Sequence, residues 1–125
     1  MRVNYKLAIA VLVGAAGGGL AVHGLHAQAT PPAYVIAEID VTDREGYTKE
    51  YLPAALRANP TPKYLAQAGR TVSFYGAPPK RIVLFSFESM DKAQAAFTSA
   101  AYKEAWAIGS KYAKFRIYAI EGVQQ

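Results

Sequence analysis

The sequence contains no cysteine, and its two histidines, His23 and His26, both lie close to the N-terminus. Disulfide bonds are therefore excluded, so a domain built from this chain depends on packing or self-association for its stability. Once residues 1–29 are removed, neither an imidazole nor a thiol remains. This excludes Ser-His-Asp and Cys-His nucleophilic sites, and zinc, copper or haem held by nitrogen and sulfur ligands. We accordingly predict no metal and no cofactor.

A strong charge of one sign is also missing. The sequence has 14 lysine and arginine residues against 9 aspartate and glutamate residues, and Arg2 and Lys6 belong to the N-terminal segment. The rest carries a net charge of +3, from 12 basic and 9 acidic residues. Its basic residues are spread singly, with only Lys80 and Arg81 adjacent, whereas nucleic-acid-binding proteins cluster them on one face. We expect no nucleic-acid partner.

The long apolar run at residues 7–22 is shorter than the about 20 residues that a membrane-spanning helix needs. It follows basic residues and leads to Ala27-Gln28-Ala29, a small-x-small sequence typical of signal peptidase cleavage. The pattern predicts a signal peptide at residues 1–29, a proline-containing linker at residues 30–32 and one domain at residues 33–125. The domain is then periplasmic or secreted, with no membrane association after cleavage. An uncleaved membrane anchor is the alternative.

Alternating and continuous apolar residues predict four strands in the domain. In chain order the strands are expected at residues 33–41, 63–75, 81–87 and 115–120. The second strand has a break near Gly69 and is followed by a turn at residues 76–79. Gly69 and Gly76 are both expected to adopt backbone angles that other residues avoid.

Two helical regions lie between these strands. The first follows a cap at Thr42 or Asp43, and Pro53 inside it should kink or divide it. The second begins after Ser89, and Ser99 can open a further segment. The order strand, helix, strand, strand, helix, strand predicts an α+β fold of the ferredoxin-like βαββαβ type. In that fold two helices cover one face of a four-stranded antiparallel sheet.

The strands at residues 81–87 and 115–120 are apolar on both faces. Helices on one side leave the other apolar face uncovered, and soluble monomers rarely expose such a surface. The sequence therefore predicts a homodimer packed sheet to sheet. A monomer with an unusually apolar surface is the alternative.

Several stretches resemble the domain-of-unknown-function 1330 family, and together they follow the whole domain in order. The resemblance implies a dimeric α/β-barrel fold, in agreement with the predicted homodimer, and it supplies no established activity. The stretches are Ala33-Tyr34-Val35-Ile36-Ala37-Glu38, Val41-Thr42-Asp43, Tyr47-Thr48-Lys49-Glu50-Tyr51, Lys80-Arg81-Ile82-Val83-Leu84, Phe87-Glu88-Ser89-Met90-Asp91-Lys92-Ala93, Ser99-Ala100-Ala101-Tyr102-Lys103-Glu104-Ala105 and Glu121-Gly122.

Three positions depart from the family's pattern. Members usually carry a glutamate before the turn glycine and another on the third strand, where this chain has Tyr75 and Ser86. They also tend to carry an arginine late in the second helix, where this chain has Gly109. If the family binds a polar ligand through those groups, this chain has lost or changed that role.

Aromatic residues form the main candidate site. Eight of the nine tyrosines follow the predicted signal peptide. With Trp106 they could line a cavity between sheet and helices that binds an apolar or aromatic small molecule, or they could fill the core and the dimer interface. The predicted ligand-binding residues are Tyr47, Tyr51, Tyr75, Ser86 and Trp106.

Two functions follow from these patterns. The first is an exported dimeric domain that binds an apolar or aromatic small molecule. The second is a cofactor-independent enzyme of the monooxygenase or isomerase type, which rests on fold analogy. Glu38 and Asp40 share a strand face and could form an acid–base pair, or could simply project at the end of the strand. A cavity holding a polar group with a displaced pKa would favour the enzyme, and a filled core would favour a binding or structural role.

Overall fold

The computed structural model describes residues 30–124, so the predicted signal peptide lies outside the described residues. The elements follow the predicted order of strand, helical region, strand, strand, helical region and strand. In chain order they are β1 (Ala33–Val41), α3 (Arg44–Gly46), η2 (Tyr47–Tyr51), α4 (Leu52–Ala58), β2 (Tyr64–Gln67), β3 (Arg81–Phe87), α5 (Met90–Thr98), α6 (Ala100–Gly109) and β4 (Ala113–Glu121).

The first helical region, from α3 to α4, contains a widened turn. Asp43 caps its start, because its side chain accepts a hydrogen bond from the Gly46 N–H. Within η2 the turn is π-helical, and the Leu52 N–H donates to the Tyr47 carbonyl. Pro53 follows directly; it lacks an N–H, and its ring crowds the carbonyl four residues earlier. The wider turn accommodates the proline, so the helix continues through α4.

The second helical region is divided by a serine. Ser89 caps α5 by accepting a hydrogen bond from the Lys92 N–H, and Ser99 caps α6 by accepting one from the Tyr102 N–H. Both serines have extended backbone angles, as N-cap residues do. Both predicted caps are confirmed.

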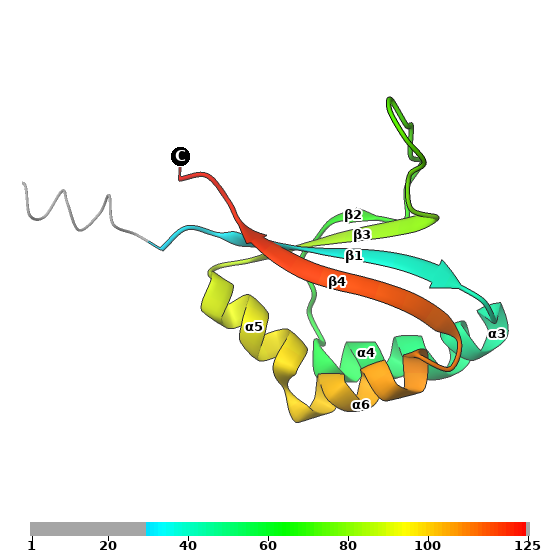
Figure 1. The fold of residues 1–125 in the computed structure, drawn as a ribbon. Helices are drawn as coiled ribbons and strands as arrows, with labels where there is room; N and C mark the ends of the chain where they lie inside the picture. The colour runs from blue at the N-terminus through cyan, green and yellow to red at the C-terminus, as the bar shows by residue number, and fades with distance from the viewer. Residues whose placement is uncertain (1–29, 125) are drawn as a thin grey trace, which may run out of the picture. The chain divides into compact units, whose positions relative to one another are not determined.

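β2 is much shorter than the predicted strand at residues 63–75. Residues 68–80 have no regular structure and form a loop that projects from the sheet on the side away from the helices (Figure 1). Gln67 lies opposite Val83, and continuing that register would set Pro78 and Pro79 opposite residues 72 and 71. Because proline has no N–H to donate, the ladder cannot continue. The predicted strand over residues 71–75 is therefore wrong.

The turn out of β2 also differs from the prediction. Ala68 adopts a φ of 54° directly after the strand, so the left-handed residue precedes Gly69. Gly76 has a φ of 77°, as predicted for a turn glycine.

The four strands form one antiparallel sheet in the order β2-β3-β1-β4. The described helices, from α3 to α6, all lie on one face of this sheet (Figure 1). This confirms the predicted α+β, ferredoxin-like architecture. β1 and β3 are the central strands, and their side chains project alternately toward the helices and away from them.

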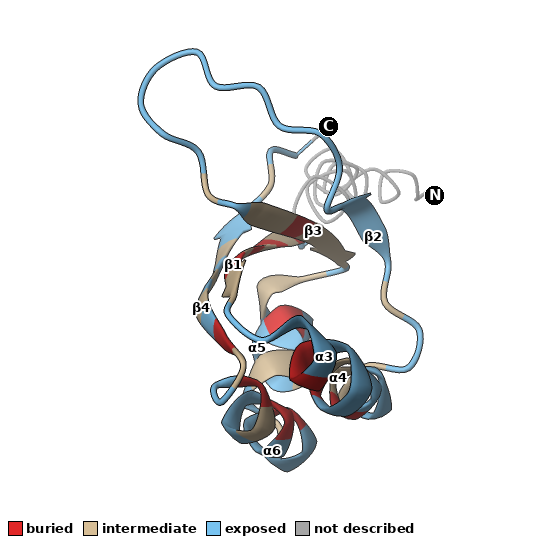
Figure 2. Cartoon of the chain, turned by 90° about the vertical axis from the view of Figure 1, so that its right-hand side faces the viewer, coloured by how far each residue is buried: buried red, intermediate tan, exposed pale blue. Residues whose placement is uncertain are grey.

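The core lies between the helices and the inner face of the sheet, where the buried residues gather (Figure 2). β1 contributes Ala33, Val35, Ala37 and Ile39, which alternate with partly covered residues. The helices contribute buried tyrosines and alanines from η2, α4, α5 and α6. One face of each central strand therefore packs in the core.

The outer face of the sheet carries apolar residues that none of the helices within residues 30–124 covers. Tyr118 is 43% exposed and Ile120 is 60% exposed, and both lie on the face of β4 opposite the core. Ile36 and Leu84 pair with each other on the same outer face of β1 and β3. Between residues 30 and 124, no helix has the length and apolar character needed to cross a membrane.

Candidate functional site

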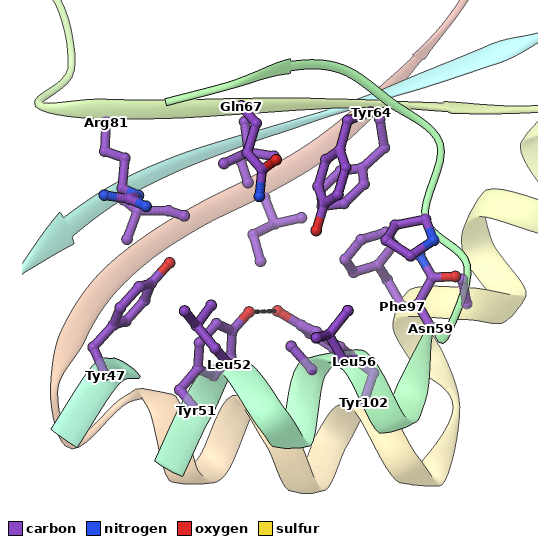
Figure 3. Close-up of a pocket in the computed structure, with 18 residues that line it drawn as sticks. Tyr47, Tyr51, Leu52, Leu56, Asn59, Tyr64, Gln67, Arg81, Phe97 and Tyr102 are labelled. Atoms are coloured by element: carbon purple, nitrogen blue, oxygen red, sulfur yellow. Dashed lines mark hydrogen bonds between the residues drawn. The ribbon is translucent and has the colours of Figure 1, made fainter. Parts of the chain in front are cut away.

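A cavity of about 170 Å³ lies between the inner face of the sheet and the helices (Figure 3). We call it the sheet–helix cavity. Strands β1, β2 and β3 form one wall, and η2, α4, α5 and α6 form the other. Eleven of its lining residues are apolar, and two of these are the phenylalanines Phe85 and Phe97. The polar lining residues are Tyr47, Tyr51, Asn59, Tyr64, Gln67, Arg81 and Tyr102.

Two phenols meet at the buried side of the cavity. The hydroxyls of Tyr51 and Tyr102 are 2.7 Å apart and hydrogen-bonded. Burial raises the pKa of Tyr51 well above the usual tyrosine value, and the neighbouring Tyr102 raises it further. Burial also raises the pKa of Tyr102, although its hydrogen bond with Tyr51 acts in the opposite direction. Both phenols therefore stay protonated at neutral pH and serve as hydrogen-bonding groups.

Tyr47 and Arg81 lie together at another part of the cavity wall. The Tyr47 ring stacks on Tyr51, with centroids 5.2 Å apart, and the Arg81 Cζ is 5.6 Å from the Tyr47 ring centre. Burial raises the pKa of Tyr47, against the lowering effects of the Arg81 charge and of hydrogen bonding to Arg81. The Arg81 Nε is buried, and no hydrogen-bond partner for it exists within residues 30–124.

The cavity opens beside the edge strand β2. Tyr47, Tyr51 and Tyr102 are 4%, 6% and 6% exposed, whereas Tyr64 is 40% exposed and Leu56 is 48% exposed. Tyr64 projects from β2 toward the cavity and packs on Phe85, with ring centroids 5.3 Å apart. A ligand that enters past Tyr64 would pass from a half-exposed rim to a buried aromatic interior.

The structure brings together two of the five predicted site residues. Tyr47 and Tyr51 line the cavity. Tyr75 is 99% exposed in the loop at residues 68–80 and does not line the cavity. Ser86 lies opposite Tyr34 on the outer face of the sheet. Trp106 is 50% exposed and lines a second, more open hollow beside α6, which shares Phe97, Tyr102 and Ile117 with the sheet–helix cavity.

The predicted set omits Arg81, Tyr102, Tyr64 and Gln67, which do line the cavity. A signal for Arg81 exists in the sequence, because it shares the phase of Val83 along the strand and Val83 faces the core. Arg81 was considered only as part of a basic pair with Lys80, so its inward position was not predicted. Tyr64 lies on β2 and Tyr102 on α6. Only the tertiary packing brings these two elements to the same cavity.

The two carboxylates considered as an acid–base pair have separate basic partners. Glu38 accepts a hydrogen bond from the Tyr118 hydroxyl and lies 3.5 Å from the Arg116 Nε. Asp40 lies 3.8 Å from the Lys80 Nζ. Both carboxylates belong to the outer face of β1, away from the sheet–helix cavity. Among residues 30–124, no cluster of three histidine, cysteine, aspartate or glutamate residues could hold a metal ion.

Gly109 has a packing reason to differ from the family's arginine. A Cβ added there would lie 2.9 Å from the Tyr51 Cε1 and 3.0 Å from the Phe115 Cζ. Any side chain at this position would displace the Tyr51 ring. The inward position of the Tyr51 ring therefore requires a glycine at position 109.

The chain was compared with known families, proteins and structures. The model of a family described as a domain of unknown function (DUF1330) matches residues 32–123. No curated protein matches the chain.

Among solved structures, a protein of unknown function from Rhodopseudomonas palustris is similar to this chain, with a TM-score of 0.53 and 12% sequence identity. The match covers 76% of this chain and 85% of that protein. A methylated form of the same protein gives a TM-score of 0.52 and 11% identity, over 76% and 83% of the two chains. At 11–12% sequence identity, this similarity shows a shared fold and nothing about function.

Proposed function

Since the chain belongs to the DUF1330 family, whose description assigns no activity, we propose a function from the geometry: an exported homodimer that binds a small aromatic molecule. The observation that carries this proposal is the sheet–helix cavity. Its volume is about 170 Å³, and apolar cavities of about 150 Å³ in proteins hold a benzene molecule. The space therefore suits a ligand with one aromatic ring.

The wall chemistry agrees with an aromatic ligand. Phe97 packs edge-on against Tyr102, with centroids 4.8 Å apart, and Tyr64 and Phe85 form a second aromatic pair. A planar ring inserted between these pairs gains further stacked or edge-on contacts. The phenols supply a few polar groups that orient the ligand, as in most small-molecule sites.

Binding is better supported than catalysis. The cavity does hold a group with a displaced pKa, Tyr51, but burial moves that pKa upward and away from neutrality. A general base or acid works best with a pKa near the ambient pH. The proposal of a cofactor-independent enzyme gains no support from these phenols.

The homodimer is proposed from the exposed apolar residues on one side of the domain. Tyr118 and Ile120 lie on the outer face of the sheet. The loop at residues 68–80 rises on that same side (Figures 1 and 2) and carries Phe74 and Tyr75, which are 85% and 99% exposed. A second copy packed against this face would cover both sets. Burying apolar surface contributes about 25 cal/mol per Å².

Export is proposed from the predicted signal peptide at residues 1–29. Mass spectrometry of the protein purified from a periplasmic fraction should give a chain that begins at Thr30. A full-length mass in that fraction, or recovery from the cytoplasm alone, would contradict the proposal.

Ligand binding can be tested with benzamide, a neutral single-ring probe, by isothermal titration. Ala55 and Ala96 line the cavity from α4 and α5, so Ala55→Phe and Ala96→Phe should each fill it and weaken binding at least ten-fold. Ala107→Phe, at an exposed position on α6, is the matched control and should bind as the wild type does. Undiminished binding by both filled variants would show that the probe binds elsewhere.

The dimer can be tested by sedimentation equilibrium. Ile120→Lys places a charge on the outer face and should shift the protein from dimer to monomer. Leu56→Lys, at a similarly exposed apolar residue on the helical side, should remain dimeric. A monomeric wild type at high concentration would refute the proposed assembly.

A further inference from the structure

Arg81 is placed inside the domain by the register of the sheet. It lies opposite Ile39 on β1, and Ile39 is 5% exposed and faces the helices. The side chain consequently projects toward the helices and into the cavity wall. Figure 3 shows its guanidinium above the Tyr47 phenol, with the Gln67 amide reaching into the same space.

No negative charge accompanies Arg81, which is partly buried as a residue and has a fully buried Nε. Among the described residues that line the cavity, Arg81 is the one with a formal charge, and it forms no ion pair with any residue between 30 and 124. The neighbouring Lys80 differs, since it pairs with Asp40 on the outer face. A guanidinium carries five N–H donors, and here the buried Nε has no acceptor among residues 30–124.

A buried N–H without an acceptor is costly, because buried polar groups in native proteins are normally hydrogen-bonded. Tyr47 can accept one hydrogen bond from Arg81 but brings no charge. A carboxylate fits the unfilled requirement, because its two oxygens match the fork of a guanidinium. The remaining cavity is aromatic and of single-ring size.

We infer that the ligand of the sheet–helix cavity is a single-ring aromatic carboxylate, held by Arg81 at its carboxylate and by the tyrosine and phenylalanine rings at its aromatic end. This inference rests on the proposed function and adds the chemical class of the ligand. Arg81 binds the carboxylate, the Tyr47 hydroxyl donates to it, and the buried phenols of Tyr51 and Tyr102 close the far side.

The test compares benzoate with benzamide at neutral pH, where benzoate is ionised and the two probes have nearly the same shape. Isothermal titration of the wild type should give benzoate an affinity about ten-fold higher or more, as expected for hydrogen bonds between charged groups. Equal affinities would overturn the inference and leave the proposed aromatic binding intact. Binding of neither probe would overturn the proposed function itself.

Variants then locate the preference. Arg81→Met should remove the advantage of benzoate over benzamide, since the change removes the charge-assisted contact. Arg81→Lys should keep part of the advantage, because a lysine supplies the charge without the fork. Arg57→Met changes an exposed arginine of α4 outside the cavity and should bind both probes as the wild type does.

A final arm separates the carboxylate from other anions. Inorganic sulfate at equal concentration should not displace benzoate, because it lacks the ring that fills the aromatic end. Displacement by sulfate as effective as that by unlabelled benzoate would show a site for charge alone and would overturn the inference. A benzoate preference that survives in Arg81→Met would overturn the role of Arg81.

Discussion

Replacing Tyr51 by phenylalanine removes one phenol oxygen from a buried pair, in which it lies 2.7 Å from the Tyr102 hydroxyl. The Tyr102 hydroxyl would then be buried without this partner, since the residue is only 6% exposed. An unsatisfied buried hydroxyl costs about 1–3 kcal/mol. Tyr102→Phe leaves the Tyr51 hydroxyl in the same position and should cost a similar amount.

The double variant should behave differently from the sum of the single ones. Removing both partners of a hydrogen bond leaves no unsatisfied group and is nearly neutral. The double-mutant cycle should therefore give a coupling free energy close to the sum of the two single losses, with a magnitude of about 2 kcal/mol or more. This sign distinguishes a true buried pair from two phenols that each bond to water.

Equilibrium unfolding in urea at neutral pH measures these differences. All variants are compared at one protein concentration, because the stability of a self-associating chain depends on concentration. Tyr75→Phe is the matched control, since Tyr75 is 99% exposed, and its free energy of unfolding should equal that of the wild type. The reasoning is refuted if the double variant loses the full sum of the two single losses, or if both single variants match the wild type.

Two further predictions concern packing and pH. Gly109→Ala should lower the free energy of unfolding by about 1–3 kcal/mol, the usual cost of overpacking, because its Cβ would lie 2.9 Å from the Tyr51 Cε1; Gly69→Ala meets nothing within 4 Å and serves as the control in thermal unfolding. The free energy of unfolding should also fall above a pH of about 10, where the tyrosines of the unfolded chain ionise. The unfolded chain then loses phenolic protons that the three buried phenols keep, since the pKa of each is raised in the folded state. Below that pH these groups should contribute no pH dependence, and urea unfolding between pH 8 and about 11 checks both statements.

The sequence predicted the architecture well because its signals are local. The alternation along residues 33–41 requires one face of a strand to be buried, and Asp43, Ser89 and Ser99 mark helix starts through hydrogen bonds to residues only three positions away. The order of elements then restricts the topology to a few arrangements. The family resemblance implied the same fold, and the match to the family model confirms that resemblance.

The candidate site was predicted only in part. Tyr47 and Tyr51 lie on one helical stripe, so their joint position follows from helix geometry. Tyr75 was misplaced because the strand expected around it is a loop, and that depends on whether a partner strand can pair with it. Trp106 and Ser86 were grouped with the others by residue type, whereas the fold sends them to different surfaces.

The sequence by itself determined the strands, the helix caps, the lack of imidazole and thiol after residue 29, and the apolar character of both sheet faces. These properties depend on residue type and on neighbours a few positions apart. Only the tertiary structure decided that β2 stops at Gln67, that Tyr51 meets Tyr102, and that Arg81 lies in the cavity wall without a carboxylate. Those outcomes depend on register and packing between segments 15 to 50 residues apart or so, where no local pattern sets the distance between two side chains.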